Sequence, residues 1–278
     1  TVRTKAHPTK LGGASMEVAL TQSAHQADVS ELQIQLPKQL VARFSTLQKA
    51  CLAATFETGP PPGKCASTAK VGTVSVTTPV LPGKLTGTAW FVSHGAEAFP
   101  DLDLVVTGDG VEVVLVGHTH IAHSSITTST YESLPDVPIT NVTVKLPVGS
   151  NSALADNGRL CNASLLAPTT IIAQSGAKIT ANTKVAVSGC SVELVSHKQR
   201  GKRLVLKVWT PEAGRISVKA PGLRTKYVRV SKSRQIKISV PLSSRALAAM
   251  HSRKKLKLRV GFTPKKGKNY SAAKLALR

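Results

Sequence analysis

Three of the chain's eight histidines, His118, His120 and His123, lie within the short segment VGHTHIAH. Alternate side chains of a strand point to the same face, so His118 and His120 would lie side by side on a strand. Such a His-x-His pair can chelate one zinc or copper ion, and a carboxylate such as Glu112 could add a further ligand. The first chemistry to consider is therefore metal binding at His118 and His120.

The residues Gly117 to His120, Gly-His-Thr-His, also resemble the last metal-binding motif of metal-dependent phosphoesterases. That resemblance implies a two-metal hydrolase with ligands from several loops. The sequence has no Asp-x-His and no Gly-Asn-His motif, and its GDGVE stretch (108–112) has the pattern of a hairpin turn. We therefore expect an exposed polar strand and no cofactor, and we keep a metal-dependent hydrolase at His118 and His120 as an alternative.

No other motif indicates catalysis. The sequence has no Gly-x-Ser-x-Gly, His-Glu-x-x-His or P-loop pattern. Asp101 and Asp103 form a pair of acids next to Pro100. A glycosidase would use such a pair across a cleft, but aspartates are mostly surface residues, and we expect these two on the surface. The sequence predicts a protein that is not an enzyme.

The 37 lysines and arginines are unevenly distributed along the chain. Residues 198–278 contain 24 of them and a single acid, Glu212, whereas residues 1–197 contain 13 cations and 13 acids. Because ordinary surfaces mix both signs, this imbalance favours binding to a polyanion. We expect an anionic cell-wall polymer or an acidic polysaccharide. Nucleic acid is a second candidate, weakened by the few aromatic side chains available for base stacking.

Apolar and basic residues alternate with period two through residues 198–278, which predicts six half-buried antiparallel strands. The outward positions of these strands give the predicted polyanion-binding residues: Lys207, Lys219, Arg229, Lys237, Lys257, Arg259 and Lys274. A helical turn is expected in SSRALAAMH, capped by Ser243 or Ser244. The polar stretch SHKQRGKR (196–203) is expected to be a linker or the start of a domain.

Residues 1–197 also have the pattern of short strands separated by Gly, Pro, Asn and Asp. The best helix candidate lies in LPKQLVARFSTLQKAC (36–51), after Pro37. The predicted fold class is all-β, with two or three immunoglobulin-like β-sandwich domains in tandem and one or two short helices. The predicted domains are 1–95, 96–197 and 198–278. The prediction allows the first two to be intertwined, with strands of one pairing in the sheets of the other.

Four cysteines, Cys51, Cys65, Cys161 and Cys190, allow three pairings. We favour bridges between sequence neighbours, Cys51 with Cys65 and Cys161 with Cys190, which imply an oxidising compartment and a secreted or cell-surface protein. No apolar run reaches about 18 residues, so no membrane span is expected. Because the chain begins with Thr1, we also expect a processed or trimmed product.

Several stretches resemble a class of uncharacterised, secreted, β-rich proteins of actinomycete-type bacteria. They are HPTKLGG, STAKVGTVSVTTPVLPGKLTGTAWFV, LPDVPITNVTVKLPVGSNSALADNGRLC and VAVSGC, within residues 5–190. The tail, with VPLSSRALAAMHSRKKLKLRVGFTP, resembles the basic immunoglobulin-like modules placed at the ends of such proteins. The resemblance implies an extracellular or wall-associated protein, and it supplies no catalytic residue.

Taken together, these patterns predict a secreted, non-enzymatic surface or cell-wall-associated structural or adhesion protein. Its basic C-terminal part would bind anionic polymers. Two alternatives are the metal-dependent hydrolase and a surface-layer or filament subunit that assembles with itself through edge strands.

Overall fold

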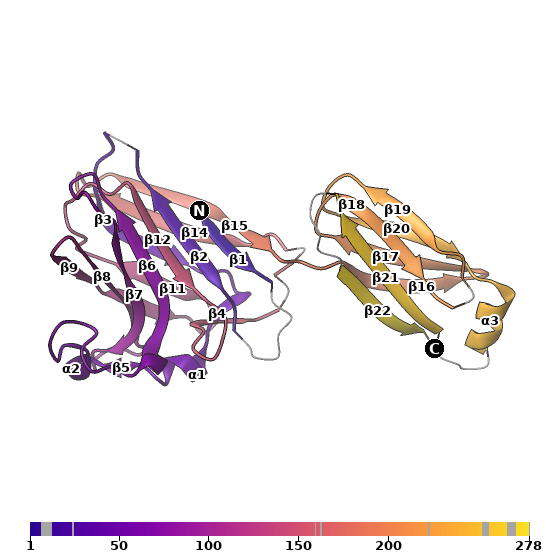
Figure 1. Cartoon of the computed structure of the whole chain (residues 1–278), viewed down its shortest axis with the longest axis horizontal. Helices are drawn as coiled ribbons and strands as arrows, with labels where there is room; N and C mark the ends of the chain where they lie inside the picture. The colour runs from indigo at the N-terminus through magenta and orange to yellow at the C-terminus, as the bar shows by residue number, and fades with distance from the viewer. Residues whose placement is uncertain are drawn as a thin grey trace. The chain divides into compact units, whose positions relative to one another are not determined.

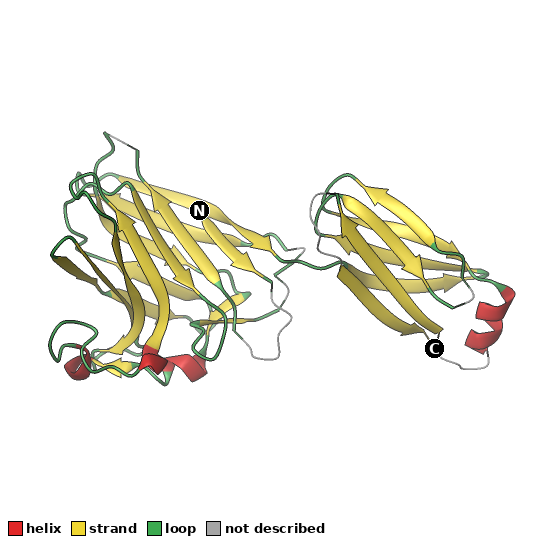
Figure 2. Cartoon of the chain, in the orientation of Figure 1, coloured by secondary structure: helices red, strands yellow, loops and turns green. Residues whose placement is uncertain are grey.

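The computed structural model describes residues 1–6, 13–23, 25–158, 160–161, 163–221, 223–251, 256–265 and 271–277. These residues are mostly in strands, with three short α-helices, α1 Phe44–Leu47, α2 Ala53–Phe56 and α3 Ser244–His251 (Figures 1 and 2). The predicted all-β class is therefore confirmed. None of the described helices is long and apolar enough to cross a membrane.

The chain forms two compact units, Thr1–Ser188 (unit 1) and Gly189–Arg278 (unit 2). The strands of unit 1 are β1 Val2–Lys5, β2 Met16–Thr21, β3 Val29–Gln35, β4 Leu40–Ala42, β5 Cys51–Leu52, β6 Lys70–Thr77, β7 Leu85–Ser93, β8 Asp101–Gly108, β9 Val111–Leu115, β10 Gly117–Ile121, β11 Thr127–Tyr131, β12 Asn141–Leu146, β13 Leu154–Asp156, β14 Leu166–Ala173 and β15 Lys178–Ser188.

Unit 1 is built on one large sheet with the order β10-β11-β3-β14-β15-β1-β2-β12-β6-β7-β8-β9, and β5 pairs with β7. Strands from 1–95 and 96–197 alternate in it: β3 lies between β11 and β14, and β2 lies between β1 and β12. The domain boundary predicted near residue 95 therefore has no counterpart in the sheet. The alternation of side chains indicates a strand but not which strand it pairs with.

The sheet curves until β8 and β10 meet. The Asp101 carboxylate accepts a hydrogen bond from the Thr119 backbone N–H (3.0 Å), and the Tyr131 hydroxyl donates one to the Leu102 carbonyl (3.1 Å). A Cβ on Gly117 would lie 2.5 Å from both the Leu102 carbonyl oxygen and the Tyr131 ring, so only glycine allows this approach. Unit 1 is thus one nearly closed sheet and not two sandwiches in tandem.

Two local predictions in unit 1 had different outcomes. The hairpin at residues 108–110 is confirmed: Gly108 pairs with Val111, and Asp109 and Gly110 have the positive φ angles of a type I′ turn. The long helix predicted over residues 36–51 is wrong. Residues Leu40–Ala42 within it form strand β4, which pairs with β13, and only one helical turn, α1, remains.

The described residues of unit 2 form seven strands in two sheets. They are β16 Glu193–Arg200, β17 Arg203–Thr210, β18 Gly214–Lys219, β19 Lys226–Val230, β20 Arg234–Pro241, β21 Leu256–Pro264 and β22 Ser271–Leu277. One sheet has the order β16-β17-β20 and the other β19-β18-β21-β22. Leu206 and Ile238 from the first and Ile216 and Phe262 from the second share one core, so unit 2 is a β-sandwich.

The stretch 196–203 was predicted as a linker or the start of a domain, and it is a hairpin near the start of unit 2. It holds the end of β16, a two-residue turn at Gly201 and Lys202, and the first residue of β17, with Arg200 opposite Arg203. Gly201 has φ +54°, which fits its place in a tight hairpin turn. The expected helical turn is present as α3, and the Ser243 hydroxyl caps it by accepting the Ala246 N–H (3.2 Å).

Both expected disulfides, Cys51–Cys65 and Cys161–Cys190, are formed. The first closes a loop with a sequence separation of 14, and Cys51 packs in a small core with Phe56 and Trp90. Replacing both Cys51 and Cys65 by serine should lower the free energy of unfolding by about 3 kcal/mol, because the unfolded chain regains the entropy of the open loop. Urea unfolding measures this loss, and equal stability of variant and wild type would contradict it.

Candidate cationic surface and the histidine pairs

The outward side of the sheet β19-β18-β21-β22 carries most of the predicted cations of unit 2. Along β18, Ile216 and Val218 point into the core. The residues that alternate with them, Arg215, Ser217 and Lys219, point to the other side of the sheet. We call this side the cationic face. Its basic residues with described side chains are Arg215, Lys219, Arg229, Lys257 and Arg259.

Cations lie directly opposite one another across neighbouring strands of this face. Arg215 pairs with Arg229 on β19, and Lys219 pairs with Arg259 on β21. On the other sheet, Lys207 pairs with Lys237. Like charges in directly opposite positions destabilise a sheet. The folded unit therefore holds positive charges together at a cost in stability.

An aromatic ring lies among these cations. The Arg215 guanidinium sits 5.0 Å from the centre of the Tyr227 ring, within the range of a cation–π interaction. The Tyr227 ring is exposed, and its contact with the guanidinium limits the orientations open to that planar group. Around this pair is a hollow of about 350 Å³, lined by Arg215, Ser217, Lys219, Tyr227, Arg259 and Thr263.

A second hollow, of about 890 Å³, lies between β19 and β20, where the two sheets of unit 2 come side by side. Its basic lining residues are Arg215, Arg229, Arg234, Lys237 and Lys265. The two hollows share Arg215 and Thr263. They are therefore adjacent, and we call the two together the basic depression.

The structure divides the predicted polyanion-binding residues between two surfaces. Lys219, Arg229, Lys257 and Arg259 lie on the cationic face, whereas Lys207 and Lys237 lie on the outward side of the β16-β17-β20 sheet. Lys237 also lines the second hollow and so belongs to the basic depression as well. Lys274 pairs with Arg259 in the register of β22, and its side chain lies outside the described residues.

Sequence reasoning missed Arg215, Ser217 and Thr263 as parts of the depression. The signal was available for Arg215, because it precedes Ile216 in the same alternation that identified Lys219. Only the pairing of β18 with β19 brings Arg215 next to Tyr227.

The histidines of the opening motif belong to a different site, on unit 1. His118 and His120 are exposed and share the outward side of β10, while Thr119 faces inward and lines a cavity. The His118 Nδ1 lies 3.0 Å from the Asp101 carboxylate. Asp101, and not the Glu112 considered from the sequence, is thus the acid next to the motif.

Asp101 and Asp103 were predicted on the surface, and this is wrong: they are 3% and 0% exposed. Strand β10 packs against this part of β8, and the Asp101 carboxylate accepts a hydrogen bond from the Thr119 backbone N–H. Asp103 lies 3.1 Å from His94 Nε2, and its Oδ1 has no hydrogen-bond partner within the described part of the chain. Burial raises the pKa of Asp103 to about 6, against the nearby charge and hydrogen bond of His94, which lower it.

This pKa predicts a pH-dependent stability. Because the folded-state pKa of Asp103 lies above its ordinary value of 3.8, protonation stabilises the fold at low pH, and this stabilisation is lost as the pH rises through about 6. Asp103→Asn carries no charge at any pH, so its stability should not fall over this pH range. Above pH 6 its free energy of unfolding should exceed that of the wild type by about 3 kcal/mol. Urea unfolding from pH 4 to 8 measures the difference.

The control for this measurement is Asp136→Asn, which changes an exposed acid. The unfolding of this variant over the same pH range is the reference against which Asp103→Asn is compared. A constant difference between Asp103→Asn and this reference would contradict the assignment of the pH dependence to Asp103.

Among the residues that the structure describes, no group of three or more His, Cys, Asp and Glu side chains is arranged to hold a metal ion. The His118–Asp101 pair joins β10 to β8, and the His94–Asp103 pair joins the loop before β8 to that strand.

No protein-family model matches the chain, and no curated protein matches its sequence. The resemblance to secreted actinomycete-type proteins therefore stays a prediction.

Proposed function

We propose that the protein is a secreted, non-enzymatic surface or cell-wall-associated protein that binds an anionic polymer through the cationic face of unit 2. The basic depression, formed by the two adjacent hollows around Arg215, would offer several cations to successive anionic groups. The two disulfides support a protein that works in an oxidising compartment.

The observation that carries this proposal is the pairing of Lys219 with Arg259. Lysine and arginine on an edge strand often serve to prevent pairing with another chain. Both β18 and β21 are central strands of their sheet, so this explanation does not apply to them. An anion bound between the two cations would lower the repulsion between them.

We also infer that unit 2 is an immunoglobulin-like module. Its seven strands, taken in chain order as A, B, C, C′, E, F and G, form an A-B-E sheet and a C′-C-F-G sheet. In this reading the cationic face is the outward side of the C′-C-F-G sheet. Such sheets form broad surfaces, which suits contact with an extended polymer.

The chemistry of the face favours an acidic wall polymer or polysaccharide over nucleic acid. Proteins that bind single strands stack successive bases on several aromatic side chains. Among the described residues, Tyr227 is the one aromatic side chain on this face, and it already packs against Arg215. Arginine and lysine can bind carboxylates and phosphates without such stacking.

Titration of the whole chain with heparin, polyphosphate and single-stranded DNA at several salt concentrations tests the proposal. We expect binding to all three at low salt, with affinity falling steeply as salt rises and the sugar polymer or polyphosphate preferred over DNA. Absence of binding at low salt would overturn the proposal. Elemental analysis of the same sample tests the hydrolase alternative, which stoichiometric zinc would favour.

A further inference from the structure

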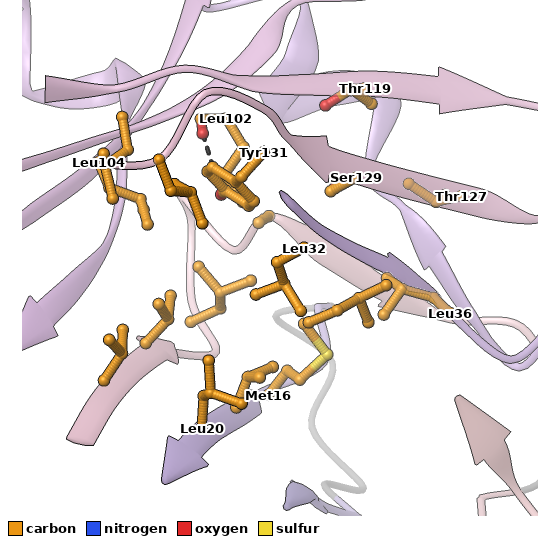
Figure 3. Close-up of a pocket in the computed structure, with 18 of the residues that line it drawn as sticks. Met16, Leu20, Leu32, Leu36, Leu102, Leu104, Thr119, Thr127, Ser129 and Tyr131 are labelled. Atoms are coloured by element: carbon orange, nitrogen blue, oxygen red, sulfur yellow. Dashed lines mark hydrogen bonds between the residues drawn. The ribbon is translucent and has the colours of Figure 1, made fainter. Parts of the chain in front are cut away.

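Unit 1 contains a cavity of about 140 Å³ between the two halves of its curved sheet (Figure 3). One wall comes from β2 and β12, with Met16, Leu20 and Val144, and the facing wall comes from β3 and β11. Close-packed interiors contain few voids larger than a water molecule. An engineered apolar cavity of about 150 Å³ in another protein binds benzene, so this space is large enough for an organic ligand.

The lining is almost wholly hydrocarbon. Its hydroxyl groups come from β10 and β11: Thr119, Thr127, Ser129 and Tyr131. Three of these are already engaged. Thr119 donates to the Gly117 carbonyl, Thr127 accepts the Ala42 N–H, and Tyr131 donates to the Leu102 carbonyl. Water needs two to four polar partners to occupy a cavity stably. The lining therefore favours an apolar occupant over water.

The lining of the cavity extends along the chain direction of its strands. It includes residues four positions apart in three segments: Met16 and Leu20 of β2, Leu32 of β3 with the adjoining Leu36, and Val142 and Leu146 of β12. Four residues of a strand span about 13 Å. A cavity of this length and small volume fits a linear chain better than a compact ring system.

The two ends of the cavity differ in exposure. At one end Met16, Leu36, Leu146 and Leu154 are all buried, at 8% exposure or less. At the other end Leu20 and Val142 are half-buried, and the loop between β11 and β12 contributes Pro135, which is exposed. The cavity is therefore closed at the first end and reaches the surface at the second.

From these features we propose that unit 1 binds a single unbranched hydrocarbon chain. The chain enters beside Pro135, and its terminal methyl group packs against Met16 and Leu36 at the closed end. The occupant is either a free single-chain amphiphile or one acyl chain of a membrane lipid. This site is independent of the cationic face, so failure of either proposal leaves the other standing.

Calorimetric titration of the whole protein with 1-hexanol, 1-octanol, 1-decanol and 1-dodecanol tests the proposal. Each added methylene should tighten binding about fourfold while the chain lies inside the cavity, and the affinity should level off once the chain extends beyond it. Native mass spectrometry after incubation with phosphatidylcholine vesicles separates the two sources, since a bound lipid identifies an acyl chain. No binding of any alkanol and no lipid adduct would overturn the proposal.

Val144→Phe should fill the middle of the cavity and weaken 1-decanol binding at least tenfold. Lys145→Phe adds the same ring at the next position of β12, where the side chain is 61% exposed, and should leave binding unchanged. Ile34→Phe fills the cavity from the facing wall and serves as a second test if Val144→Phe does not fold, as judged by circular dichroism. Unchanged binding in the folded filled variants would show that the chain binds elsewhere.

Discussion

The triple variant Arg215→Gln, Lys219→Gln, Arg259→Gln should bind a polyanion about 100-fold more weakly than the wild-type chain at low salt, because each cation near an anionic surface contributes about 1 kcal/mol. The slope of log affinity against log salt should also fall by about two to three, since three fewer counterions are released. Fluorescence anisotropy with labelled heparin measures both quantities.

A matched control removes the same charge from unit 1. Lys38, Lys49 and Lys64 are exposed, and their replacement by glutamine lowers the net charge equally. This control should retain nearly all of the affinity. If both variants lose affinity to the same extent, binding depends on net charge alone and the cationic face is not a site.

Phe262→Ala should lower the free energy of unfolding of unit 2 by about 3–5 kcal/mol. Phe262 is 2% exposed and packs in the core shared by the two sheets of unit 2. That loss is a large part of the roughly 5–15 kcal/mol that stabilises a native domain. Calorimetry should show the unfolding transition of unit 2 shifted to a lower temperature. The transition of unit 1 should stay in place, since the two main core clusters share no residue.

Tyr227→Ala is the complementary change, because Tyr227 is 53% exposed and contacts Arg215. It should leave the stability of unit 2 nearly unchanged while weakening polyanion binding. Phe262→Ala should lower the stability of unit 2, but below its unfolding transition it should bind the polyanion as tightly as the wild type. If Phe262→Ala loses affinity while still folded, or Tyr227→Ala binds as tightly as wild type, the assignment of these roles is contradicted.

The cationic face could largely be predicted from the sequence because it depends on local periodicity. Alternation placed Lys219 and Arg259 outward and Ile216 inward, and the structure agrees. Position on a strand does not specify neighbours, however. The contact of Arg215 with Tyr227 and the separation of Lys207 from the face follow from strand order, which alternation does not determine.

Unit 1 shows more clearly what a local pattern cannot provide. Asp101 and Asp103 are buried because β10 returns over β8, a contact between segments that no alternation predicts. Gly117 in the Gly-His-Thr-His motif has a structural explanation, since it lets Tyr131 approach Leu102. The apolar cavity likewise exists only once the sheet has curved around it.

Chemical footprinting of the whole protein tests the central claim most directly. Lysines are acylated with and without saturating heparin, and their labelling is compared by mass spectrometry. We predict strong protection of Lys219 and Lys257 on the cationic face, and unchanged labelling of Lys64 and Lys145 on unit 1. Lys219 and Lys257 labelled as readily in the complex as in the free protein would contradict the assignment of this face as the polyanion site.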